Sequence, residues 1–189
     1  MTALASSAHN SEVPGFPGVS FGISADGMTV ALRPLTFDDA AVVLAINEAS
    51  VHLLAPMDED EYRWFLDVAS IAWGAEVDGV LAGFVLVLDP GCAYDSRNSA
   101  WFSERYESFA YLDRVAIDVR ARRRGVGTTI YDAVEAHAAE RRVPLLLEVN
   151  VEPPNHPSLA FHASRGFEEV GTLSHDDGAK VVRLLAKAF

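Results

Sequence analysis

A short, basic, glycine-containing connection between a strand and a helix is the feature that most limits how this chain can fold. Residues 108–118 have the pattern of a strand, residues 126–142 have that of a helix, and Arg122, Gly125 and Gly127 mark the connection. Glycines let backbone N–H groups approach a ligand, and the first turn of a helix leaves its N–H groups unpaired at the positive end of the dipole. The connection therefore predicts an anion-binding site.

The spacing differs from that of the common nucleotide-binding loops. It lacks the Gly-Lys-Ser/Thr ending of a P-loop, and two glycines stand where a dinucleotide-binding fingerprint has three. The arginines at positions 120, 122, 123 and 124 oppose the helix dipole, so a bound anion would explain why they are there. The alternative is a solvated basic turn with no ligand.

The composition indicates one acidic globular domain. The chain has 189 residues, half of them apolar, and a net charge of −12, which argues against nucleic acid or an anionic membrane as a partner. Residues 1–27 are rich in Ala, Ser, Gly and Pro and are predicted to be a flexible tail, which leaves residues 28–189 as a single domain. We expect a cytoplasmic location, because no segment has the pattern of a signal peptide or a membrane span.

Cysteine and histidine usage gives no indication of a disulfide or a metal site. Cys92 is the only cysteine, so an intrachain disulfide is not possible. No Cys/His group has the spacing of zinc ligands. We therefore expect a reduced compartment and no metal.

The order of the predicted elements gives the fold class. The strands are expected at residues 29–34, 71–77, 80–89, 108–118, 145–151, 167–173 and 181–185, and the helices at 36–48, 58–70, 126–142 and 158–164. Asp78-Gly79 is a strong signal for a two-residue hairpin turn. Residues 90–106 are expected to be a long connection. This order predicts an α/β (α+β) fold, in which helices flank both faces of a mixed, mostly antiparallel central sheet.

Two motifs together resemble the GNAT superfamily of N-acyltransferases. The first is Arg122-x-x-Gly125-x-Gly127 between a strand and a helix, and the second runs from Asn155 through His162 to Gly166-Phe167. They occur in the family's order, and the resemblance covers about residues 29–189. It implies the GNAT fold, acetyl-CoA (coenzyme A) as the acyl donor and transfer of an acetyl group to an amine.

The resemblance also implies which residues hold acetyl-CoA. The strand before the loop supplies backbone groups to the pantetheine arm, the loop N–H groups hold the pyrophosphate, and an asparagine on the short helix hydrogen-bonds the arm. An arginine at position 123, where relatives usually have glycine, puts the backbone conformation there in question. The implied cofactor-binding residues are Val115, Ala116, Ile117, Arg122, Arg123, Arg124, Gly125, Val126, Gly127, Thr128 and Asn155.

Asp113 and His162 are the candidate catalytic residues. Strand alternation puts Asp113 on the same face as Val115 and Ile117, where many relatives have a general base. The alternative for Asp113 is a structural ion pair with Arg114. His162 occupies the position of the tyrosine thought to protonate the thiolate in relatives, and imidazole can give a proton near neutral pH. The alternative for His162 is a packing role at the edge of the core.

An acidic and aromatic group of side chains is predicted to border the acceptor pocket. Such a group suits a cationic or aromatic amine, although some of its rings could instead cover the edge of the sheet. The candidate acceptor-binding residues are Tyr94, Asp95, Ser96, Trp101 and Tyr111.

The predicted function is acetyl-CoA-dependent N-acetylation of a primary amine on a small molecule. Two alternatives stay open: a non-catalytic acyl-CoA sensor or interaction module, and an N-acetyltransferase for proteins or peptides. Residues 181–185 could pair between chains in a homodimer or could close the sheet of one domain. Sequence alone does not choose among acceptors, because the site and not the fold determines the substrate.

Overall fold

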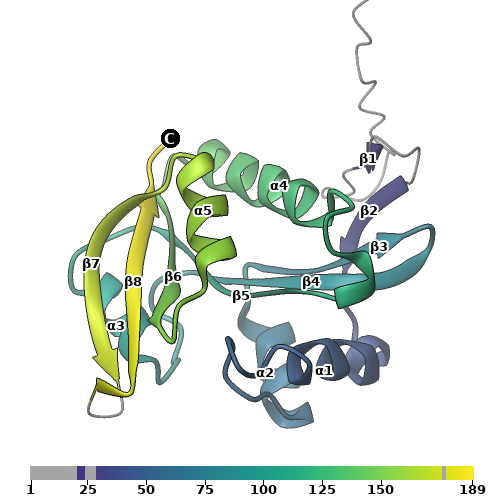
Figure 1. Cartoon of the computed structure of the whole chain (residues 1–189), viewed down its shortest axis with the longest axis horizontal. Coiled ribbons are helices and arrows are strands. Elements are labelled where there is room, and N and C mark those ends of the chain that lie inside the picture. The colour runs from purple at the N-terminus through teal and green to yellow at the C-terminus, as the bar shows by residue number, and fades with distance from the viewer. Residues whose placement is uncertain (1–20, 24–28, 176–177) are drawn as a thin grey trace, which may run out of the picture.

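The computed structural model describes residues 21–23, 29–175 and 178–189. In these residues an eight-stranded sheet has the strand order β1-β2-β3-β4-β5-β6-β8-β7 (Figure 1). Every neighbouring pair is antiparallel except β5 with β6. The strands are β1 (Phe21–Ile23), β2 (Thr29–Pro34), β3 (Ile71–Val77), β4 (Val80–Leu88), β5 (Ala110–Ile117), β6 (Leu145–Glu152), β7 (Glu168–His175) and β8 (Lys180–Lys187).

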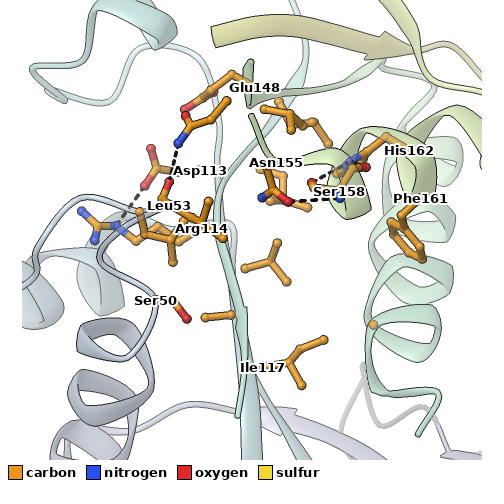
Figure 2. A pocket seen from close by; sticks show the side chains of 18 of the residues that line it. Ser50, Leu53, Asp113, Arg114, Ile117, Glu148, Asn155, Ser158, Phe161 and His162 are labelled. Atoms are coloured by element: carbon orange, nitrogen blue, oxygen red, sulfur yellow. Dashed lines mark hydrogen bonds and ion pairs between the residues drawn. The ribbon is translucent and has the colours of Figure 1, made fainter. Parts of the chain in front are cut away.

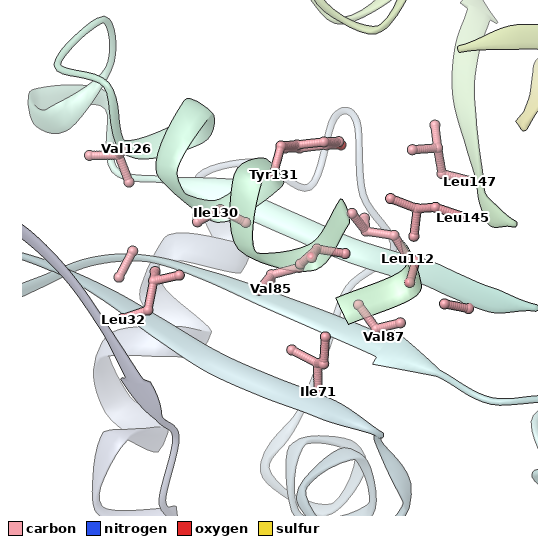
Figure 3. Packing of buried hydrophobic residues seen from close by; sticks show 14 of the residues in the cluster. Leu32, Ile71, Val85, Val87, Leu112, Val126, Ile130, Tyr131, Leu145 and Leu147 are labelled. Carbon is pink, nitrogen blue, oxygen red and sulfur yellow. The ribbon is translucent and has the colours of Figure 1, made fainter. Parts of the chain in front are cut away.

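Helices cover both faces of the sheet, as predicted. Figure 1 shows α4 and α5 on one side and α1 and α2 on the other. The helices are α1 (Ala40–Glu48), α2 (Glu59–Val68), α3 (Arg97–Ser103), α4 (Val126–Arg141) and α5 (His156–Ser164). Val126 and Ile130 of α4 lie over Leu32 and Val85 in one buried cluster (Figure 3). A second cluster packs Val43 of α1 and other helix side chains against the opposite face. Both faces of the sheet are apolar and covered by helices, so the sheet is the middle layer of the fold.

The hairpin between β3 and β4 forms at the predicted turn. Asp78 has a φ of +52° and Gly79 a φ of +80°, and Val77 is paired with Val80. Two successive positive φ values are the geometry of a type I′ turn, which matches the twist of antiparallel strands. Asp-Gly is among the pairs that tolerate this geometry best.

β5 and β6 are joined over a very short length. Their parallel pairing comprises Ala110 with Leu145 and Tyr111 with Leu146. Beyond these pairs β5 continues along β4, as far as Ile117 opposite Gly83, and β6 continues along β8. The two middle strands therefore separate, and the sheet opens between them.

Three details differ from the expectations or refine them. The connection at residues 90–106 contains the helix α3, which Ser96 caps by accepting a hydrogen bond from Ser99 N–H at 3.3 Å. The segment expected to be a tail includes β1, which pairs with β2, while its other residues lie outside the described part. β8 lies between β6 and β7, so residues 181–185 close the sheet within one chain and are not at its edge.

Candidate active site

One cavity, with a volume of about 980 Å³, occupies the opening between β5 and β6. Its walls are the diverging parts of these strands, the connection before α4, the first turns of α4 and α5, the segment after α1 and the segment that leads into α3. Figure 2 shows Asp113 and Glu148 on one side of the cavity and His162 with Ser158 on the other. Most of the predicted site residues meet here.

The basic connection adopts a left-handed backbone at two places. Gly125, the N-cap of α4, has a φ of +82°, and Arg123 has a φ of +62°. The latter is a conformation that favours glycine, and here an arginine adopts it. The first hydrogen bond of α4 runs from Thr129 N–H to Gly125 O at 2.9 Å, which leaves the N–H groups of residues 126–128 outside the helical ladder.

The cavity lining includes most of the connection. The lining residues here are Arg122, Arg123, Gly125, Gly127 and Thr128. The Arg122 side chain is held near the end of β5 by a 3.3 Å hydrogen bond from Nε to the Ile117 carbonyl. A β-carbon on Gly127 would lie 3.3 Å from Ile117 Cδ1, so glycine keeps the helix start close to β5. Val126 instead points into the core, and Arg124 is not among the lining residues.

Val115, Ala116 and Ile117 line the cavity from β5, and Asn155 lines it from the start of α5. The Asn155 side-chain oxygen accepts a hydrogen bond from Ser158 N–H at 3.2 Å, so this residue caps the helix. The cap is a structural role, and the position of Asn155 in the cavity lining is also compatible with the expected hydrogen bond to a ligand.

Asp113 lies in the cavity wall and is almost fully buried, with a side chain that is 5% exposed. Its pKa is raised because burial disfavours the charged form, against the opposing effects of Arg114 and of hydrogen bonds with Tyr94 and Tyr111. Arg114 Nε lies 3.3 Å from Asp113 Oδ2. The ion pair considered as an alternative is therefore present, on a carboxylate that also faces the cavity.

Arg114 is itself held from several sides. Its guanidinium bonds Glu61 Oε1 at 2.7 Å, the Ala55 carbonyl at 2.8 Å and Asn47 Oδ1 at 3.2 Å. A buried charge needs such partners to offset its lost hydration. These contacts tie β5 to α1, to α2 and to the segment between them.

Glu148 on β6 is a site residue that the sequence analysis missed. It lines the cavity, and its carboxylate accepts a hydrogen bond from the Tyr111 hydroxyl at 2.9 Å. Burial, followed by the negative charge of Asp113, raises the pKa of Glu148 to about 7. A carboxylate with this pKa can gain and lose a proton at neutral pH. The available signal was that Glu148 is the one acidic residue within the mostly apolar run of residues 145–151.

The predicted acceptor residues divide into two groups. Tyr94, Asp95 and Ser96 line the cavity. Tyr111 is fully buried and outside the lining, and its hydroxyl bonds Glu148, which does line the cavity. Trp101 lies outside the lining: its indole packs against Gly171 of β7 and lies under the Arg105 guanidinium, 3.9 Å from the ring centroid. Trp101 therefore covers the sheet, which was the alternative interpretation of these rings.

His162 lines the cavity from α5 and is 4% exposed. Its Nε2 lies 2.6 Å from the hydroxyl of Tyr131 on α4, and its Nδ1 lies 2.7 Å from the Ser158 carbonyl oxygen. Burial is the main cause that lowers the pKa of His162, so the imidazole is neutral at pH 7. Tyr131 also lines the cavity and was not among the predicted residues.

The cavity therefore has two ends of opposite character. Arginines and helix N–H groups at one end suit a phosphate-bearing ligand, and two carboxylates at the other suit a cation. Among the described residues no group of His, Cys, Asp and Glu could hold a metal ion. No helix in the described ranges is long and apolar enough to cross a membrane.

Solved structures similar to this chain include two described as N-acetyltransferases and one in complex with a bisubstrate analogue. A candidate phosphinothricin N-acetyltransferase has a TM-score of 0.64 and 20% identity, over 85% of this chain and 98% of that one. For the ribosomal-protein-alanine N-acetyltransferase of Brucella melitensis the TM-score is 0.60 and the identity 25%, over 84% and 99%. Arabidopsis thaliana Naa50, in complex with the bisubstrate analogue CoA-Ac-MVNAL, has a TM-score of 0.65 and 13% identity, over 85% and 99%.

Sequence comparison agrees with the fold. No curated protein matches the chain significantly. The model of the acetyltransferase (GNAT) family matches residues 40–167, which is well over half of the chain and includes both motifs. This protein is therefore a member of the GNAT family of acetyltransferases.

Proposed function

We propose that this acetyltransferase transfers the acetyl group of acetyl-CoA to the primary amine of a small molecule. The observation that carries the proposal is that one cavity connects the basic connection before α4 with Glu148, whose pKa is about 7. A donor site and a proton acceptor within one cavity are what direct acyl transfer to an amine requires.

The residues fit the donor. Arg122 and Arg123 would pair with its phosphates, and the N–H groups at the start of α4 would hold the pyrophosphate. The pantetheine arm would be bound by backbone groups of Val115, Ala116 and Ile117 and by the Asn155 amide. Bound acetyl-CoA supplies an acetyl thioester, which is an electrophile for amines. The CoA-based analogue held by Naa50 supports this choice of donor.

Glu148 is the better candidate for the general base. Near pH 7 the Glu148 side chain is ionised in about half of the molecules. Its carboxylate can therefore take a proton from the attacking amine and return it to solvent. Asp113 contributes a second negative charge that raises the pKa of Glu148 and attracts a cationic acceptor. Asp113 forms an ion pair with Arg114, so it is less available than Glu148 to accept the proton of the amine.

The walls of the acceptor end favour a small molecule. The residues that line this end of the cavity include Tyr94, Asp95, Ser96 and Asn98, together with Leu53 and Lys180. The two buried carboxylates favour an amine that arrives as a cation. A peptide N-terminus is the second candidate for the acceptor, because the analogue bound to Naa50, CoA-Ac-MVNAL, includes a peptide sequence.

Calorimetric titration with acetyl-CoA is the first test, on the wild type and on Gly127→Glu. This glycine has an ordinary φ and faces Ile117, so the new side chain would place bulk and negative charge in the cavity. Val119→Glu is the matched control, because Val119 is 70% exposed and outside the cavity lining. We expect binding by the wild type and the control and none by Gly127→Glu.

Turnover is then measured with small primary amines and with short peptides that have a free N-terminus. A preference for small amines would support the proposal. A preference for peptides would show that the acceptor is a peptide N-terminus. Binding of acetyl-CoA without turnover of any amine would identify a sensor. A folded wild type that does not bind acetyl-CoA would overturn the proposed function.

A further inference from the structure

Tyr131 and His162 form a buried pair on the helical side of the cavity. Tyr131 is 3% exposed and His162 is 4% exposed, and 2.6 Å separates the tyrosine hydroxyl oxygen from Nε2. The two residues come from different helices, α4 and α5, and both line the cavity. Two polar groups that face the site are thus bonded to each other.

The hydrogen in this pair belongs to the tyrosine. Nδ1 of His162 lies 2.7 Å from the Ser158 carbonyl oxygen, which can only accept, so Nδ1 carries the ring proton. In a neutral imidazole Nε2 then has a lone pair and accepts from the Tyr131 hydroxyl. His162 therefore has no N–H directed at the cavity, whereas Tyr131 has an O–H that can turn toward it.

The surroundings hold the pair in place. The Tyr131 ring lies edge-on to Phe161, with centroids 5.0 Å apart, and to Phe167, with centroids 6.2 Å apart. The Arg165 guanidinium lies 5.6 Å from the Tyr131 ring centroid and is bonded to Glu135 at 2.6 Å. Arg165 also lowers the pKa of Tyr131, although burial raises it more. The net effect is a raised pKa, so the Tyr131 hydroxyl keeps its proton at neutral pH and has it to give.

We propose that the Tyr131 hydroxyl, oriented by His162, is the proton donor to the departing thiolate. This rests on the proposed function. The Oη–H bond breaks as an S–H bond forms, the electron pair of the O–H bond stays on Oη, and solvent returns a proton to the Tyr131–His162 pair after coenzyme A leaves. Figure 2 shows His162 across the opening from Glu148, so the proton is given and taken on opposite sides of the site. His162 is then a positioning residue.

The first test needs no ligand. Nitrogen-15 NMR of the imidazoles in the free protein should show His162 as the neutral tautomer with its proton on Nδ1. In Tyr131→Phe the signal of the unprotonated Nε2 should shift, because its hydrogen bond is lost. A His162 protonated on Nε2 in the wild type would overturn the assignment.

The second test uses turnover with acetyl-CoA and the best amine. Tyr131→Phe keeps the ring and removes only the hydroxyl, so kcat should fall by about 10² to 10⁴-fold while the acetyl-CoA Kd stays unchanged. Adding His162→Phe should cause little further loss, because residues that act as a unit are not additive. Tyr62→Phe is the matched control: it removes another buried hydroxyl, bonded to Thr36 O at 2.9 Å outside the cavity lining, and should leave kcat unchanged.

The outcomes distinguish failure of the Tyr131 assignment from failure of the proposed function. Normal turnover by Tyr131→Phe, with loss only in His162→Phe, would overturn the assignment and make His162 the donor. Equal losses of kcat and of acetyl-CoA binding in Tyr131→Phe would show a structural role instead. A wild type with no turnover at all would overturn the proposed function itself.

Discussion

The Tyr111 hydroxyl lies 2.9 Å and 3.1 Å from the two carboxylate oxygens of Glu148 and is also hydrogen-bonded with Asp113. One hydroxyl has one proton, so it can donate to one of these carboxylates at a time. The other carboxylate is left buried beside a negative charge, and both effects raise its pKa. This arrangement keeps one proton available between the two acids near neutral pH.

Glu148→Gln should lower kcat by about 10² to 10⁴-fold, because the amide cannot take a proton from the amine. The acetyl-CoA Kd should stay the same, since the residue lies at the acceptor end. In the wild type kcat should rise with pH through about 7 as Glu148 loses its proton. Steady-state kinetics from about pH 5.5 to about pH 9 check both points, and an unchanged kcat in the variant would remove Glu148 from the mechanism.

Asp113→Asn distinguishes the two carboxylates. If Glu148 is the base, loss of the neighbouring negative charge lowers the pKa of Glu148, so the rise of activity moves to lower pH with a modest change in kcat. If Asp113 is the base, activity is lost at every pH. The pH dependence of kcat in this variant decides between them.

The raised pKa of Glu148 also has a consequence for stability. The pKa rises from 4.5 to about 7 on folding, so between these values the native state holds more protons than the unfolded state. The free energy of unfolding should therefore fall as pH rises through this window. Because a tenfold change in proton affinity corresponds to about 1.4 kcal/mol, Glu148→Gln should be more stable than the wild type by about 1 to 3 kcal/mol at about pH 8 and nearly equal to it at about pH 4.5. Urea titrations at both pH values measure the difference.

Arg123→Gly separates backbone geometry from charge. Glycine adopts the φ of +62° without the penalty of a side chain but is more flexible when unfolded, so the free energy of unfolding should change by less than about 1 kcal/mol. The acetyl-CoA Kd should nevertheless rise, and its dependence on salt should become weaker, because a cation in the lining is lost. Calorimetry at two salt concentrations measures both effects. An unchanged Kd would mean that Arg123 does not contact the ligand.

Gly171→Ala tests the position of Trp101. A β-carbon at this glycine would lie 2.6 Å from Trp101 Cζ2, so the substitution should destabilise the fold by about 1 to 3 kcal/mol. Trp101→Leu in the same chain should recover part of the loss by making room. Thermal unfolding of the single and double variants gives the comparison, while Trp101→Leu alone should leave the acetyl-CoA Kd unchanged.

Local patterns were sufficient to predict most of the fold and the position of the connection before α4. The Asp78-Gly79 turn and the connection before α4 each depend on a few neighbouring residues, and the structure has both where they were expected. α3 was not predicted because its seven residues carry no apolar period, and the Ser96 cap alone is a weak signal. Short helices are stabilised by packing, here of Phe102 in the core, which a sequence pattern does not reveal.

The carboxylates of the cavity and its Tyr131–His162 pair depend on contacts between distant segments. Glu148 and Tyr111 are 37 residues apart, and Tyr131 and His162 are 31 apart. Strand alternation identified the face that Asp113 shares with the cavity, but the raised pKa of Glu148 comes from burial and from a neighbour on another strand. Trp101 was grouped with the site by its place in the chain, yet its packing against β7 takes it elsewhere.

The separation of β5 from β6 gives this protein a strand edge in its interior. An edge strand usually lies at the surface, where its unpaired backbone groups can recruit another chain. Past Tyr111, the side of β5 that β4 does not occupy faces the half-open cavity of about 980 Å³ instead. Only a molecule slender enough to enter that space can add itself to the sheet there, so the enzyme can keep an open edge without the risk of aggregation that such edges carry.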